Sequence, residues 1–101
     1  MMILRKKKVE IQDDTVLQRD PEQEFTYIDG EVVMLSLKRG EYFGLDEIGS
    51  RIWEILEKPI PFSALVDQLL EEFEVGREEC ENDTREYLEI LYKKELLVET
   101  T

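Results

Sequence analysis

The period of the hydrophobic pattern changes near the middle of the chain. Up to about residue 45, apolar and polar residues alternate in short runs, as they do in strands, and beyond it apolar residues recur every three or four positions, as they do in helices. The pattern predicts strands at 15–18, 25–28, 31–38 and 41–45. It predicts helices at 47–56, 62–73 and 78–95. The run 15–18 is short, and 25–28 either extends it or forms a separate strand.

Turn residues indicate how the strands are joined. Asp29-Gly30 is a hairpin turn signal, and Arg39-Gly40 marks a second hairpin. Of two registers for the second hairpin we favour the one with the loop 38–40, which pairs Leu35 with Phe43 and puts Gly40 at a left-handed bulge. One face would then carry Val33, Leu35, Leu37, Phe43 and Leu45. The other would carry Val32, Met34, Ser36, Tyr42 and Gly44.

Helix boundaries are also marked. Asp46 is the expected N-cap of the first helix, Pro59 and Pro61 stop it, and Gly76 separates the other two. Residues 96–98 should close the core. We therefore expect an α+β fold, winged-helix-like, with an N-terminal three-stranded antiparallel sheet followed by three helices.

Composition and charge narrow the choice of partners. The 101 residues fit one domain, and 25 Asp and Glu against 13 Lys and Arg give a formal net charge of -12. The half from residue 51 onward holds most of that charge, including the outward positions of the last predicted helix. Because such a surface repels phosphate and anionic lipid, we expect no nucleic-acid partner and no membrane partner.

The residues for catalysis are largely missing. The chain has no His and one Cys, which removes His-based catalysis, Cys clusters and intrachain disulfides. Cys80 lies in an apolar stripe and is read as a core residue, and the paired glutamates are read as solvated helix faces. We expect no catalytic residue, no cofactor and no metal. No signal peptide or bilayer-length apolar run is seen, which favours the cytoplasm.

The two ends of the chain differ in role. The basic run Arg5 to Lys8 suggests that residues 1–14 form a flexible basic N-terminus, and the domain would then span 15–101. Within that domain, the strand Glu41 to Leu45 comes last in the sheet, so one of its edges is expected to be free. An extended peptide, or a second copy of the chain in an edge-strand homodimer, can add a strand there. From the pattern alone, an ordinary hairpin strand is an equally good interpretation.

The segment Gly40 to Leu56 resembles the signature of PqqD-like proteins: a glycine, an aromatic pair, a Leu-Asp-x-x-Gly step and an Ile-Trp helix. The segments 65–69 and 83–91 resemble the family's second and third helices, so the likeness covers about residues 15–98. In particular the chain resembles the small stand-alone members that serve lasso-peptide biosynthesis, which are RiPP recognition elements (RiPP: ribosomally made, post-translationally modified peptide). Glu95 departs from the pattern, because the family often has Gly there.

The resemblance implies a non-catalytic protein that binds the leader segment of a precursor peptide. The leader would add an antiparallel strand to the third strand, beside the third helix, and be presented to a leader peptidase and a cyclase. Carried onto this chain, the leader-binding residues are Met34, Glu41, Tyr42, Phe43, Gly44, Leu45, Tyr87, Leu88, Leu91, Tyr92 and Glu95. Two alternatives remain: a PqqD-type chaperone for a radical-SAM enzyme, and an acidic winged-helix protein-interaction module.

Overall fold

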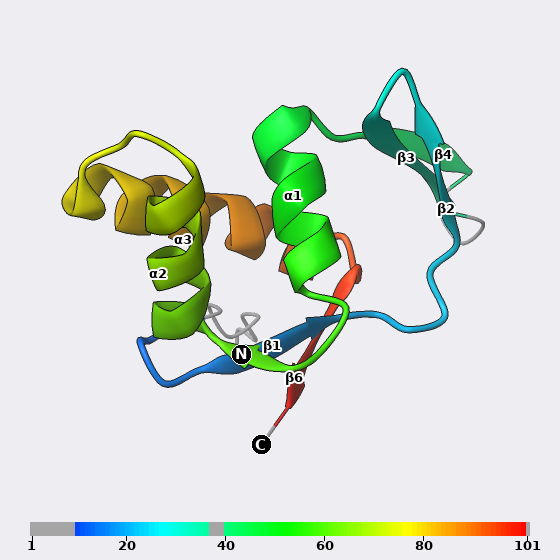
Figure 1. The fold of residues 1–101 in the computed structure, drawn as a ribbon. Coiled ribbons are helices and arrows are strands. Elements are labelled where there is room, and N and C mark those ends of the chain that lie inside the picture. The colour runs from blue at the N-terminus through cyan, green and yellow to red at the C-terminus, as the bar shows by residue number, and fades with distance from the viewer. Residues whose placement is uncertain (1–9, 37–39, 101) are drawn as a thin grey trace, which may run out of the picture.

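The computed structural model describes residues 10–36 and 40–100. In chain order its elements are β1 (Val16–Arg19), β2 (Phe25–Ile28), β3 (Glu31–Ser36), β4 (Glu41–Gly44), α1 (Glu47–Ile55), β5 (Ile60–Pro61), α2 (Phe62–Glu72), α3 (Arg77–Lys93) and β6 (Leu97–Thr100) (Figure 1). The α+β class and the three helices are confirmed, with helix ends within two residues of those predicted.

The described strands form two antiparallel sheets of three strands. One has the order β2-β3-β4 and is the expected N-terminal sheet. The other has the order β5-β1-β6 and was not predicted, because β1 pairs with residues 97–100 at the far end of the chain. Figure 1 shows β2-β3-β4 on one side of α1, α2 and α3 on its other side, and β1 and β6 below the helices. The likeness to a winged helix stays a prediction.

The β2–β3 turn is as expected, and the β3–β4 register is not. Asp29 and Gly30 both have positive φ angles, 53° and 83°, as a two-residue type I′ turn requires. Gly40 is also left-handed, with φ 61°. However, β4 pairs Phe43 with Met34 and not with Leu35. The register is shifted by one residue, so Phe43 and Leu45 share the face of Val32 and Met34, and Tyr42 and Gly44 share the face of Val33 and Leu35. The predicted faces were wrong because β3 is apolar on both sides, so its pattern does not say which side is buried.

Helix α1 covers the inner face of β2-β3-β4. Asp46 caps its N-terminus by accepting a hydrogen bond from the Gly49 N–H at 2.7 Å, as predicted. The buried Ser50 hydroxyl accepts from the Val32 N–H at 2.9 Å and donates to the Leu45 carbonyl at 3.1 Å, so it ties the helix to both β3 and β4. Trp53 is fully buried beneath β2, where Phe25 meets it edge to face.

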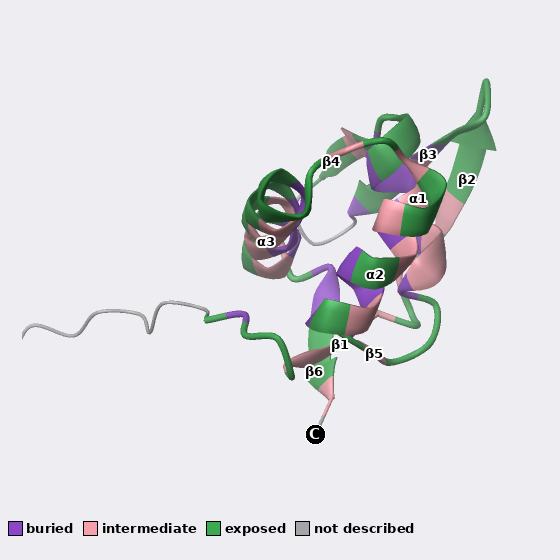
Figure 2. Cartoon of the chain, turned by 60° about the vertical axis from the view of Figure 1, so that its left-hand side comes forward, coloured by how far each residue is buried: buried purple, intermediate pink, exposed green. Residues whose placement is uncertain are grey.

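Figure 2 shows that buried residues face inward from all three helices. Cys80 is among them and lies 3.8 Å from the Thr84 hydroxyl, so its interpretation as a core residue is confirmed. Among the described residues no helix is long and apolar enough to cross a membrane.

Helix α3 ends in a Schellman motif whose left-handed residue is Glu95. The Glu95 N–H donates to the Tyr92 carbonyl at 2.9 Å and the Leu96 N–H to the Leu91 carbonyl at 3.0 Å. Glu95 has φ 61°, a conformation that favours glycine. The departure from the family pattern therefore leaves the helix end in the usual geometry but puts a residue with a Cβ into it.

Ordered contacts begin before residue 15. Ile11 is buried in the core, and its carbonyl accepts a hydrogen bond from the Arg85 side chain at 2.9 Å. The Asp13 carbonyl accepts from the Ser63 N–H. Residues 10–14 thus contact α2 and α3, and the basic run 5–8 lies outside the described residues.

Candidate functional site

Strand β4 lies at the edge of its sheet. In the described part of the chain it pairs with β3 alone. The Leu45 N–H donates to the Val32 carbonyl, and backbone groups alternate in direction along an antiparallel strand. The Leu45 N–H and the N–H and C=O groups of Phe43 and Glu41 therefore point toward β3. Those of Tyr42 and Gly44 point to the free edge, where they offer two donors and two acceptors.

The side chains of β4 divide between the two faces of the sheet. Phe43 shares the inner face with Met34 and is half-buried, whereas Tyr42 shares the outer face with Leu35 and is 76% exposed. A Cβ on Gly44 would meet no described atom within 4 Å, so there is room over the outer face at this position.

Helix α3 runs antiparallel to the segment formed by β4 and the start of α1. Near its end, the Lys94 ammonium lies 4.4 Å from the centre of the Phe43 ring. Earlier in the helix, the Tyr87 hydroxyl packs against Gly49, where any added Cβ would clash with it. Between the start of α1 and α3 lies a cavity of about 180 Å³. It is lined by Asp46, Ile48, Gly49, Ile52, Asp83, Thr84 and Tyr87.

Tyr87 places a polar atom beside this cavity. Its hydroxyl is buried and has no hydrogen-bond partner among the described residues. Burial, and then the nearby charge of Asp46, raise the pKa of Tyr87 well above the ordinary value, so the phenol stays protonated. A buried hydroxyl without a partner costs free energy, so an incoming acceptor would be favoured.

The eleven predicted site residues fall into two groups. Glu41, Tyr42, Gly44 and Glu95 are exposed, and Phe43, Tyr87 and Tyr92 are partly buried, so all seven can be reached from outside. The side chains of Met34, Leu45, Leu88 and Leu91 are buried, with exposed fractions of 7% or less. These four support the site from inside the core and do not line it, although the Leu45 backbone lies at the end of β4.

Sequence reasoning missed the residues of the cavity other than Tyr87. They come from the first turns of α1 and from α3, and the Gly of the Leu-Asp-x-x-Gly step, Gly49, was the available signal. Its small size is what allows the Tyr87 ring to approach α1.

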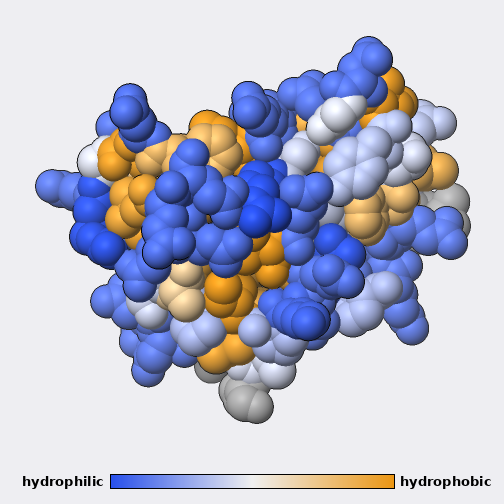
Figure 3. Space-filling view, viewed as in Figure 1, coloured by the Kyte–Doolittle hydropathy of each residue, from blue (hydrophilic) through white to orange (hydrophobic). Residues whose placement is uncertain are grey.

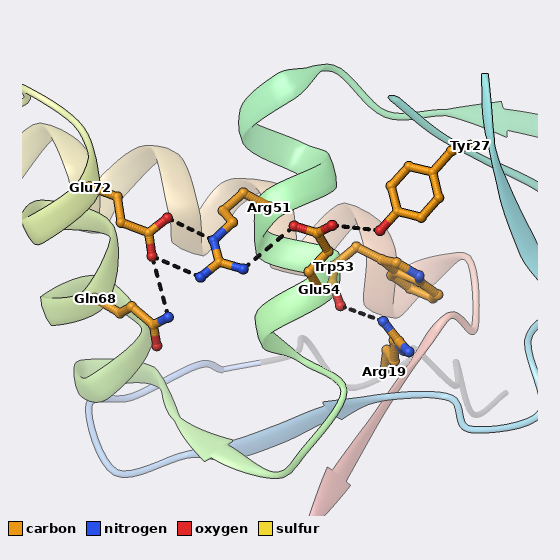
Figure 4. A network of polar contacts seen from close by, with 7 residues as sticks. All are labelled: Arg19, Tyr27, Arg51, Trp53, Glu54, Gln68 and Glu72. Carbon is orange, nitrogen blue, oxygen red and sulfur yellow. Dashed lines mark hydrogen bonds and ion pairs between the residues drawn. The ribbon is translucent and has the colours of Figure 1, made fainter. Parts of the chain in front are cut away.

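A polar network lies on α1 away from β4 (Figure 4). Arg51 donates two hydrogen bonds to Glu72 on α2, at 2.7 and 3.0 Å, and Glu54 accepts one from the Tyr27 hydroxyl. Hydrogen bonding to Arg51 lowers the pKa of Glu72, which is opposite to what a general acid needs. The network ties α1 to α2 and β2.

Arg19 on β1 also contacts this helix. It donates to the Trp53 carbonyl at 3.1 Å, and its guanidinium lies over the Phe25 and Trp53 rings.

Comparison with known proteins identifies the family to which this chain belongs. The family model described as "Coenzyme PQQ synthesis protein D (PqqD)" matches residues 31–97, which is more than half of the chain. The chain belongs to the PqqD family.

Among solved structures, "TbiB1 in Complex with the TbiA(beta) Leader Peptide" matches with 42% sequence identity and a TM-score of 0.71. The match covers 79% of this chain and 93% of TbiB1. TbiB1 is thus a PqqD-like relative solved with a leader peptide. No curated protein matches.

Proposed function

We propose that this protein is a RiPP recognition element that binds the leader segment of a precursor peptide as a strand added to the free edge of β4, beside α3. The observation that carries the proposal is the outward direction of the Tyr42 and Gly44 backbone groups, which a peptide strand would pair with. The 42% identity to a protein solved with a leader peptide supports the same conclusion.

The proposal also implies positions for the side chains of the added strand. Its residue opposite Phe43 would face inward toward Lys94 on α3, and its residue opposite Leu45 would face the cavity beside Tyr87. These two inward side chains are two residues apart in the peptide, and apolar side chains would bury area against the aromatic walls.

No reaction follows binding in this proposal. The sequence has no His, and its role would be to hold the peptide for other enzymes. We propose that these are a leader peptidase and a cyclase of a lasso-peptide pathway in the cytoplasm. A neighbouring gene for a radical-SAM enzyme, in place of a peptidase and a cyclase, would favour the PqqD-type chaperone instead.

The Gly44→Pro variant tests the strand edge with a matched control. Proline at position 44 removes an N–H that points to the free edge and leaves the β3–β4 bonds in place. Gly44→Ala keeps the N–H and adds a methyl group where there is room. In titration calorimetry with the synthetic leader, we expect about tenfold weaker binding for Gly44→Pro and about wild-type affinity for Gly44→Ala.

Two results would count against the proposal. One is that the wild-type protein fails to bind the leader at tens of micromolar. The other is equal affinity for Gly44→Pro and Gly44→Ala with both folds intact, which would move the peptide away from β4. Because the same edge could pair with a second copy, sedimentation of the free protein should accompany the titration.

A further inference from the structure

The sheet β2-β3-β4 has a second face that none of the described helices covers. Its side chains point away from α1, because directly paired residues share a face and α1 lies on the face of Val32 and Met34. We call this surface the outer sheet face, and its members are Thr26, Ile28, Glu31, Val33, Leu35, Tyr42 and Gly44.

The centre of the outer sheet face is apolar although it is exposed. Ile28 is 56% exposed, Leu35 39% and Tyr42 76%, and Val33 is half-buried between its neighbours. An antiparallel sheet with one solvated face usually places polar residues on it. Figure 3 shows one side of the molecule, where hydrophilic side chains predominate and apolar patches lie among them. A cluster of apolar side chains on such a protein marks an interaction surface.

Carboxylates border this face. Glu31 lies on the face beside Ile28, Glu24 and Asp29 are exposed at its margin, and the described residues of β2, β3 and β4 include no Lys or Arg. Lys38 and Arg39 lie outside the described residues. An apolar centre with an acidic border fits a partner whose apolar patch is ringed by Lys and Arg. It does not fit a second copy, because the chain carries a net charge of -12 and two acidic borders would meet.

The outer sheet face continues into the proposed peptide site. A strand added at β4 would extend the same sheet, so every second peptide side chain would join this face next to Tyr42. A protein docked on the face would therefore contact the carrier and the peptide together. That is the arrangement an enzyme needs if it is to act on the peptide while the peptide is held.

We propose that the outer sheet face is the docking surface for the enzyme that processes the bound peptide. That enzyme would contact the face through an apolar patch of its own, ringed by cationic side chains. The inference rests on the proposed function. It adds the surface, its residues and the chemistry of the partner.

The test uses the purified leader peptidase encoded in the gene neighbourhood, with the precursor peptide as substrate. Ile28→Ser and Leu35→Ser each remove an apolar side chain from the outer sheet face and leave the β4 edge intact. We expect the affinity for the leader alone to change less than twofold. The KM of the peptidase for the carrier–peptide complex should rise about tenfold, and added salt should raise it further.

Two exposed apolar residues outside the face serve as controls. Ile90→Ser on α3 and Val98→Ser on β6 remove side chains that are 46% and 39% exposed, and both should keep the wild-type KM. The inference would be overturned if Ile28→Ser and Leu35→Ser behaved like these controls. It would also be overturned if sedimentation showed a wild-type dimer that both variants abolish, because the occupant would then be a second copy.

The two proposals can fail separately. A wild-type chain that binds no leader overturns the proposed function and this inference with it. A wild-type chain that binds the leader, with a KM unaffected by the outer-face variants, overturns this inference alone.

Discussion

The two sheets of this protein are built from different kinds of connection. In β2-β3-β4, each strand pairs with the next one along the chain through a hairpin. In β5-β1-β6, the central strand β1 pairs on one side with β5 and on the other with β6, near the end of the chain. We call the first sheet the open sheet, because it joins neighbouring segments and presents the edge of β4. We call the second the closed sheet, because it joins segments far apart in the chain, although it too has edge strands.

Neighbouring backbone bonds strengthen this contrast. The Arg19 N–H donates to the Leu56 carbonyl at 2.8 Å, and the Asp20 N–H to the Leu96 carbonyl at 2.9 Å. The Phe62 N–H donates to the Thr15 carbonyl at 2.8 Å. The closed sheet therefore anchors the ends of helices α1 and α3 and the start of α2. Among the described residues the open sheet is held mainly by α1, and the edge of β4 and the outer sheet face are left uncovered.

The largest expected effect compares one leucine from each sheet. Leu17, on β1, is 2% exposed, and Leu17→Ala should lower the free energy of unfolding by about 3 kcal/mol. Leu35, on the outer sheet face, is 39% exposed, and Leu35→Ala should cost less than about 1 kcal/mol. Urea denaturation followed by circular dichroism measures both. Equal losses would show that the two sheets contribute alike to stability.

A smaller effect is expected where α1 holds the open sheet. Ser50→Ala leaves the buried Val32 N–H and Leu45 carbonyl without their hydroxyl partner, which should cost about 2 kcal/mol. Since the bonds lie at the base of β4, hydrogen exchange should speed up in β3 and β4 more than in β1. Ser63→Ala, at an exposed position on α2, is the control and should change neither measurement. If hydrogen exchange sped up equally in both sheets, the local role of Ser50 would be contradicted.

The smallest effect concerns the junction between α3 and the closed sheet. Glu95→Gly removes the Cβ from a left-handed residue and should raise the free energy of unfolding by about 1 kcal/mol. The control is Glu86→Gly in the middle of α3, which should lower it by about 1 kcal/mol. A loss of stability in Glu95→Gly would mean that the contacts of the Glu95 side chain outweigh the backbone strain.

Local signals in the chain predicted much of the fold. Asp46 was found as the cap of α1 because capping depends on one side chain and the next three residues. Asp29-Gly30 was found because a type I′ turn needs two left-handed residues. The β3–β4 register was predicted wrongly, since Val33 and Leu35 look as suitable for a core as Val32 and Met34. Only the position of α1 determines which pair is buried.

The candidate site was predicted less completely. Its backbone part, the edge of β4, followed from the resemblance and from the place of Glu41 to Leu45 at the end of the sheet. Helical spacing put Tyr87, Leu88 and Leu91 together but did not separate the half-buried Tyr87 from the two buried leucines. That separation depends on what packs over each residue, and so does the cavity beside Gly49.

The sequence by itself determined the helices, the Asp29-Gly30 turn, the acidic charge and the absence of His, because these depend on neighbouring residues or on composition. The tertiary structure alone decided the closed sheet, the buried face of β3, the outward direction of the Tyr42 and Gly44 backbone groups and the exposed outer sheet face. Each of these depends on which distant segments pack together. Hydrophobic pattern says that a residue prefers burial, but not which element will bury it.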